Sequence, residues 1–210
     1  MSEPLTLEVF SDYVCPWCYL GDNRVKRLQD NFDIDVRLVH FPLHPETPAE
    51  GQRLIDLFRT DQAGIDEKNE RMQGLMSAEG LPFKPRTHTF NSRLAQEVGT
   101  WAGTQPGGDA IHDLFFEAYF VDGRNIGDPE VILDVVRKAG LDVEAARDVI
   151  EARSFKDAVD ADWSKSHAYG VTGVPTFVSE GHGMVGAQPY EALVSFVTEM
   201  GARPRGDSAG

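Results

Sequence analysis

The sequence predicts an α/β fold in which a βαβ unit and a ββα unit are separated by a large α-helical insertion. Strand patterning begins close to the N-terminus and flanks a helical segment. Residues 42–170 then carry helix caps and glycine stops, whereas residues 171–200 return to short strands and a last helix. We therefore expect one domain built from residues 1–41 and 171–200, a helical insertion at 42–170, and a disordered tail at 201–210.

The N-terminal unit is read from three consecutive segments. Residues 5–10 alternate as a strand does, and residues 15–31 carry apolar side chains at helical spacing. Residues 33–41 alternate strictly and then become apolar, which is typical of a strand that is buried at its end. Together these segments predict a βαβ unit.

Helix signals follow one another through the insertion. The segment Thr47-Pro48-Ala49-Glu50 combines an N-cap residue, a proline at the first helical position and a glutamate three residues after the cap. We expect helices at about 47–59, 66–79, 91–103, a segment ending near 121, 128–140, a short segment from 142, and 155–169. Asn91 and Ser92 stand at the start of the third of these helices. We interpret them as helix-capping residues in preference to residues that contact a substrate.

The C-terminal unit is expected to hold two strands and a helix. Residues 176–178 and 184–185 read as strands joined by a glycine-rich connection at 180–183. Residues 189–200 read as an amphipathic helix. Pro175 stands directly before the first strand, a position where proline is tolerated.

Composition excludes two classes of partner. The 210 residues carry a formal net charge of −14, and no basic cluster is present that would bind nucleic acid or anionic lipid. No apolar stretch reaches the roughly 20 residues of a membrane span. The N-terminus shows neither the basic nor the apolar region of a signal peptide, so we expect a cytoplasmic protein.

The two cysteines of the chain stand as Cys15-Pro16-Trp17-Cys18 at the predicted strand-to-helix junction. A thiol attacks a disulfide as its thiolate, and the dipole and free amides of a helical first turn stabilise that anion. We expect Cys15, at the helix end and near solvent, to be the nucleophile and Cys18, one turn inward, to resolve the mixed disulfide. Pro16 suits the first turn. Trp17 is an uncharged residue beside the nucleophile, where a histidine could add a cationic partner. The Cys15–Cys18 pair should therefore be less strongly oxidising than a pair with histidine at position 17.

Three other interpretations compete with redox chemistry. Cys15, Cys18, His40 and His44 formally make a zinc pattern, but four residues of strand would separate the two histidines by about 13 Å. A structural disulfide would close too small a loop to stabilise the fold and would stay reduced in the cytosol. A chaperone or binding module would use a groove of aromatic side chains, although residues at helical spacing are more often core: Trp101, Phe115, Phe116, Tyr119, Phe120 and Trp163.

Three separated blocks together resemble the thioredoxin superfamily, and more narrowly the DsbA-like, FrnE-type oxidoreductases. They are residues 11–21 around the cysteine pair, residues 171–177 (Val-Thr-Gly-Val-Pro-Thr-Phe) and residues 186–189 (Gly-Ala-Gln-Pro). The resemblance implies a thioredoxin-like fold with a large α-helical insertion. It also implies that Pro175 is a cis-proline beside the thiols and that the backbone of Val174 pairs with a bound peptide or glutathione.

The resemblance and the cysteines lead to one functional prediction. We expect an enzyme that carries out dithiol–disulfide exchange through Cys15 and Cys18 on a disulfide-containing protein or a small thiol substrate, with no bound metal or cofactor. Related 2-hydroxychromene-2-carboxylate isomerases and kappa glutathione transferases usually have serine where Cys15 stands. Retention of both cysteines here favours dithiol redox chemistry over glutathione-dependent isomerisation. A glutathione-dependent isomerase or transferase is the alternative, and glutathione is a candidate co-substrate. The sequence leaves the oligomeric state open.

Overall fold

The computed structural model describes residues 3–206. Its main sheet has the strand order β6-β5-β1-β2-β7. The strands are β1 (Leu5–Ser11), β2 (Phe32–His40), β5 (Thr176–Ser179), β6 (His182–Val185) and β7 (Arg203–Pro204). β1 pairs with β2 in parallel and with β5 in antiparallel orientation, so the two halves of the predicted domain meet at β1.

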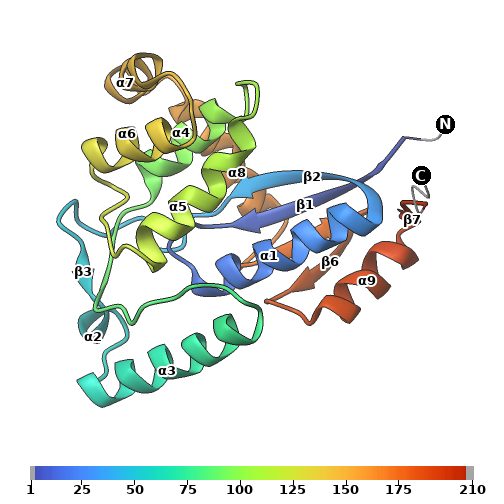
Figure 1. Ribbon diagram of the computed structural model, residues 1–210, viewed down its shortest axis with the longest axis horizontal. Helices are drawn as coiled ribbons and strands as arrows, with labels where there is room; N and C mark the ends of the chain where they lie inside the picture. Colours follow the sequence, from blue (N-terminus) through green and yellow to red (C-terminus); the bar gives the residue numbers. More distant parts are fainter. Residues whose placement is uncertain (1–2, 207–210) are drawn as a thin grey trace.

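Helices cover both faces of this sheet (Figure 1). α1 (Pro16–Asn31) and α9 (Tyr190–Glu199) pack on one face, where Leu7 and Val9 of β1 join a buried apolar cluster with residues of both helices. α8 (Lys156–Ala168) lies against β2, and its Lys165 pairs with Glu8 on the other face of β1. The alternation of β1 thus buries both of its faces.

The segment between β2 and β5 is largely helical, as predicted. Besides α8 it contains these elements: β3 (Gln52–Arg53), α2 (Leu54–Leu57), α3 (Gln62–Ala78), β4 (His88–Thr89), α4 (Arg93–Ala102), η1 (Gly108–Ala110), α5 (Ile111–Phe120), α6 (Pro129–Lys138) and α7 (Val143–Ala152). The fold is therefore the expected α/β fold with a helical insertion. Ser92 is the N-cap residue of α4 but makes no side-chain capping hydrogen bond, whereas the preceding Asn91 accepts at Oδ1 from the Arg93 N–H at 2.9 Å.

The predicted helix at 47–59 is wrong. Only Leu54–Leu57 is helical there, and Gln52–Arg53 pairs instead with His88–Thr89 as a short two-stranded sheet. Gly51, with φ of +92°, approaches the Phe90 ring so closely that a Cβ would lie 2.6 Å from it. The capping pattern at Thr47 is local, and this contact with a distant segment overrides it.

Two C-terminal predictions also need correction. The hairpin turn is only Glu180-Gly181, both at positive φ, because His182 and Gly183 already belong to β6. The tail is not wholly disordered, because Arg203–Pro204 forms β7 against Phe32–Asp33 of β2. The last predicted tail residues, 207–210, lie outside the described residues.

The six aromatic residues do not form an exposed groove, because five of them are buried in the larger core cluster. Their exposure does not exceed 5%: Trp101, Phe115, Phe116, Tyr119 and Phe120. Trp163 is half-buried and donates from Nε1 to Gln96 Oε1 at 2.9 Å. Within residues 3–206 no helix combines the length and the apolar composition that crossing a bilayer requires.

Candidate active site

The two cysteines lie at the start of α1, directly after β1. Cys15 is the N-cap residue and Pro16 stands at the first helical position, as predicted. Cys18 and Tyr19 donate their backbone N–H groups to the Cys15 carbonyl at 3.0 and 3.2 Å, which begins the helix. Both thiols are free. Cys15 is only 3% exposed and is reached through a pocket.

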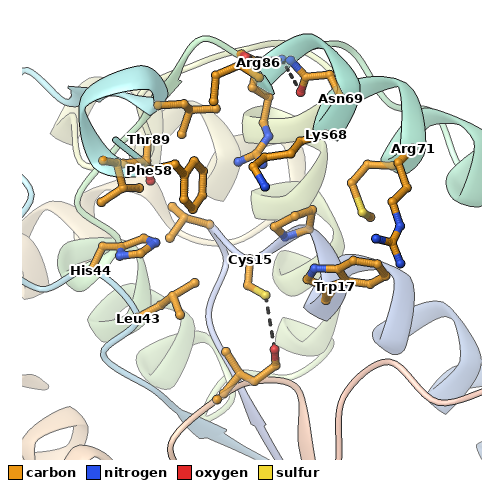
Figure 2. A pocket seen from close by; sticks show the side chains of 18 residues that line it. Cys15, Trp17, Leu43, His44, Phe58, Lys68, Asn69, Arg71, Arg86 and Thr89 are labelled. Carbon is orange, nitrogen blue, oxygen red and sulfur yellow. Dashed lines mark hydrogen bonds between the residues drawn. The ribbon is translucent and has the colours of Figure 1, made fainter. Parts of the chain in front are cut away.

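Val174 and Pro175 lie beside the thiol pair. The Cys15 thiol donates to the Val174 carbonyl oxygen at 3.5 Å (Figure 2), and the Val174–Pro175 peptide bond is cis. Gly21 of α1 permits this approach, since a Cβ there would lie 3.2 Å from Pro175 Cγ. The loop before β5 is thereby packed against the first turns of α1.

The two thiols differ in environment. Cys18 is 2% exposed, and burial raises its pKa well above the ordinary value, with the neighbouring Cys15 thiol adding to the effect. The Ser11 hydroxyl and the Asp12 backbone oppose the rise and do not cancel it. Cys18 therefore stays protonated at neutral pH until a group accepts its proton.

Cys15 opens into a pocket of about 390 Å³, here called the Cys15 pocket (Figure 2). Its floor includes Cys15, Trp17 and Val174, and much of its wall is apolar. α3 supplies one side: Ile65, Lys68 and Met72 recur at helical spacing and line the cavity. The insertion thus forms a wall over Cys15.

Cations gather around this pocket although the chain as a whole is strongly acidic. Lys68, Arg71 and Arg86 line it together with His44, and its described lining contains no Asp or Glu. The Arg71 guanidinium lies 5.5 Å from the centroid of the Trp17 ring. Burial lowers the pKa of His44, and Arg86 adds to that effect, so His44 is neutral at pH 7. The pocket is suited to an anionic ligand.

Two hydrogen-bonding atoms of this pocket are buried and lack a partner among the described residues. They are the Thr89 hydroxyl oxygen and the Arg86 Nε. Arg86 is held in place by Asn69, whose Oδ1 accepts from the Arg86 backbone N–H at 3.1 Å and whose Nδ2 donates to the Arg86 carbonyl at 2.9 Å. Buried donors of this kind are costly unless a ligand or water satisfies them.

Asp12 connects the cysteine loop to the rest of the site. Its carboxylate accepts from the Val14 N–H at 3.1 Å and from the Leu43 N–H at 3.0 Å, and its backbone oxygen accepts from the Cys15 N–H at 3.0 Å. Burial raises the pKa of Asp12 to about 6, against hydrogen bonds that lower it, from Ser92, Val14, Leu43 and Gln96. One carboxyl group thus fixes both the thiol loop and the Leu43 wall of the pocket.

The sequence missed most of the pocket wall. Lys68, Arg71, Arg86 and Thr89 carry no local signal, because only the docking of the insertion brings them near Cys15. His44, interpreted as a loop residue, lies in a loop and also lines the pocket. His40 lines a different cavity, and no group of three or more His, Cys, Asp or Glu in residues 3–206 is arranged to hold a metal ion. The geometry gives the zinc interpretation no support.

A free C-x-x-C pair at a helix N-terminus, packed against the residues that open an antiparallel strand, defines a thioredoxin-fold protein of the dithiol class. The chain belongs to the DSBA-like thioredoxin domain family, whose model matches residues 6–198. The predicted family resemblance is confirmed.

Individual proteins agree with this assignment. The uncharacterized protein YwbO of Bacillus subtilis is 26% identical over 177 residues, which cover 82% of this chain and 85% of YwbO. A probable DsbA oxidoreductase from Streptomyces coelicolor superimposes with a TM-score of 0.86 at 27% identity, covering 93% of this chain and 89% of that one. The cytosolic disulfide reductase DsbM from Pseudomonas aeruginosa, solved with GSH, shares the fold at 20% identity and a TM-score of 0.64, covering 93% of this chain and 100% of DsbM.

Proposed function

We propose that this protein is a thiol–disulfide oxidoreductase that exchanges disulfides through Cys15 and Cys18, and that its substrate is a small disulfide bearing carboxylates, such as glutathione disulfide. The observation that carries the proposal is the position of the Cys15 thiol at the floor of a cationic pocket. Carboxylates pair with lysine and arginine, and the buried Thr89 and Arg86 donors await an acceptor.

The exchange proceeds in two steps. The Cys15 thiolate attacks one substrate sulfur, the substrate S–S bond breaks, and the first thiolate leaves with the electron pair. Cys18, as a thiolate, then attacks Cys15 Sγ and releases the second substrate thiolate. The substrate gains two electrons and the protein retains the Cys15–Cys18 disulfide. A reductase working in this direction needs a pool of reduced thiols to restore its dithiol. The cytoplasm contains such a pool.

The charge of the pocket gives a direct test. Lys68→Ser combined with Arg71→Ser should lower kcat/KM for glutathione disulfide roughly tenfold, because both cations are exposed and each contributes about 0.2–1 kcal/mol. Turnover of the uncharged hydroxyethyl disulfide should change little. A control pair with the same charge change, Arg137→Ser with Lys138→Ser on α6, should leave both rates unaltered. Equal loss on both substrates would contradict the assignment of substrate charge.

The same cationic pocket favours a second candidate, a glutathione-dependent isomerase or transferase. In that mechanism Cys15 binds or activates glutathione and Cys18 is dispensable. Cys18→Ser separates the two functions. The oxidoreductase should stop at a mixed disulfide on Cys15, detectable by mass, whereas the isomerase should keep turning over. Cys15→Ser should abolish disulfide exchange; retention of exchange would refute the first proposal.

A further inference from the structure

One buried arginine joins three separate parts of the chain. Arg24, in the middle of α1, is only 9% exposed. Its Nε and Nη2 donate to Glu79 Oε1 at 2.9 and 2.7 Å, and Glu79 is the C-cap residue of α3. Its Nη1 donates to the Ala187 and Gln188 carbonyls at 3.0 and 2.7 Å. Arg24 thus contacts α3 with one edge of its guanidinium and the connection between β6 and α9 with the remaining nitrogen.

The first contact fixes the position of α3. Of the 17 residues of this helix, all of them in the described part of the chain, four are buried: Ile65, Asn69, Met72 and Met76. So narrow a buried stripe leaves polar contacts at the helix ends to decide where the helix lies. Lys68 and Arg71 of the Cys15 pocket belong to the same helix. The pair between Arg24 and Glu79 therefore holds the C-terminal end of the helix that carries these cations.

The second contact holds the loop that contains Pro175. The two carbonyls that accept from Arg24 directly follow Gly186, whose N–H donates to the Pro175 carbonyl at 2.7 Å. Val174, the residue before Pro175, accepts at its carbonyl from the Cys15 thiol at 3.5 Å. Arg24 is therefore connected, through hydrogen bonds of the backbone, to the peptide group that lies against the thiol.

Cys15 stands between the two segments that Arg24 joins. In Figure 2, Lys68 and Arg71 lie on one side of Cys15, and its hydrogen bond to Val174 points to the other side. Within residues 3–206, Arg24 is not one of the residues that line the Cys15 pocket. Any effect of Arg24 on a substrate must therefore pass through α3 and through the loop before β5.

We propose that Arg24 is a positioning residue, which holds the α3 wall and the Val174–Pro175 loop in their places on either side of Cys15. A planar guanidinium suits this task, because its fixed fork of donors binds two partners at once. The contact with α3 serves binding of the charged substrate, and the contact with the loop serves the reaction at Cys15. This assignment deepens the function proposed above and rests on it.

Glu79→Ala breaks the contact with α3 and leaves the contact with the loop in place. We expect KM for glutathione disulfide to rise about threefold to tenfold while kcat changes little. The upper limit is the roughly tenfold loss expected when Lys68 and Arg71 themselves are removed. The kinetic constants for the uncharged hydroxyethyl disulfide should stay within about twofold of the parent values, because that substrate does not use the cations.

Arg24→Met breaks both contacts. It should reproduce the rise in KM for glutathione disulfide and also lower kcat about tenfold for both disulfides, because the peptide group beside the Cys15 thiol is no longer held in place. Adding Glu79→Ala to Arg24→Met should raise KM little further, since both changes remove the same contact. Arg27 Nη1 lies 3.8 Å from Glu79 Oε2, so the carboxylate keeps a cationic neighbour in Arg24→Met.

Hydrogen–deuterium exchange of the full-length protein reports the two contacts without turnover. Glu79→Ala should speed amide exchange in α3 alone, whereas Arg24→Met should speed it in α3 and in residues 171–188. A residue that only stabilises the fold would speed exchange evenly along the chain. Arg153→Met is the control, because it removes one partner of the buried Glu97 carboxylate in the insertion, outside the contacts of Arg24. It should lower stability and leave the kinetic constants unaltered.

The proposal is overturned if Glu79→Ala leaves KM for glutathione disulfide unchanged, or if that variant loses equally on both disulfides. Evenly raised exchange in Arg24→Met, or an Arg153→Met variant with the same kinetic defect, also overturns it. If the parent protein does not reduce glutathione disulfide, the proposed function fails and the role of Arg24 fails with it. A parent with normal turnover and an Arg24→Met variant equal to it reject the role of Arg24 alone.

Discussion

Replacing Asp12 by asparagine should change how stability depends on pH. Burial raises the pKa of this carboxyl group from its ordinary value of 3.8 to about 6, so the folded protein binds a proton there between these two pH values and the unfolded chain does not. Stability from this group is therefore present at low pH and is lost as the pH rises from about 4 to 6. A shift of about two units at about 1.36 kcal/mol per unit amounts to about 3 kcal/mol.

His40 changes the pH dependence of stability in the opposite direction, over a pH range that overlaps that of Asp12. Its pKa is lowered to about 3, so its contribution to stability grows as the pH rises towards its ordinary value of 6.5. The difference between parent and variant cancels this term. Asparagine keeps the volume at position 12 and loses one acceptor for the Val14 or Leu43 N–H, which adds an offset that does not depend on pH.

Urea unfolding at pH 4, 5, 6 and 7 measures the effect directly. The free energy of unfolding of the parent minus that of Asp12→Asn should fall by about 2.4 kcal/mol from pH 4 to 7, because the unfolded carboxyl is already partly ionised at pH 4. Asp148→Asn, at an exposed position on α7, serves as the control and should give a nearly constant difference. A flat difference for Asp12→Asn, or one that rises with pH, would refute the reasoning.

Three further predictions concern single side chains. Trp17→His should make the thiol pair more oxidising in equilibrium titration against glutathione, because histidine adds a cationic partner at the nucleophile; an unchanged or lower potential would count against this. Phe115→Ala should destabilise the fold by about 3–5 kcal/mol in denaturant titration, because the side chain is fully buried in the larger core, and a loss below 1 kcal/mol would contradict its placement. Glu97→Gln should lower the free energy of unfolding by about 3 kcal/mol in the same titration, because its carboxylate is 1% exposed and pairs with both Arg93 and Arg153. Arg93→Gln should lower it less, because Glu97 then keeps one partner.

Local patterns predicted the parts of this protein that depend on neighbours in sequence. Cys15 caps α1 and Pro16 begins it because both roles are set within one turn. β1 and β2 follow from alternation over consecutive residues. The predicted helix starting at Thr47 failed for the converse reason, since the backbone of Gln52 pairs with that of Thr89 far along the chain.

The residues of the candidate site also fall into two groups, those that local sequence predicts and those that only tertiary packing brings together. The thiol pair could be found from a spacing of three residues, whereas the pocket above it requires α3 to dock across α1. Lys68 and Arg71 are charged residues on an exposed helix face. From the sequence alone they cannot be distinguished from the charged residues of any solvated helix surface. Asp12 carried no signal either, because its effect depends on burial against Leu43 and α4.

The cations of the Cys15 pocket all come from α3 and the segment that follows it, whereas Cys15 caps α1 and Cys18 lies in its first turn. In the proposed function, the residues that react and the residues that select the substrate therefore belong to separate stretches of the chain. If the proposed function holds, exchanging residues 62–89 for a segment of different charge should change which disulfides react while leaving the exchange at Cys15 and Cys18 intact. A single scaffold of this kind can diversify its substrates by changes in one surface helix and its adjoining loop.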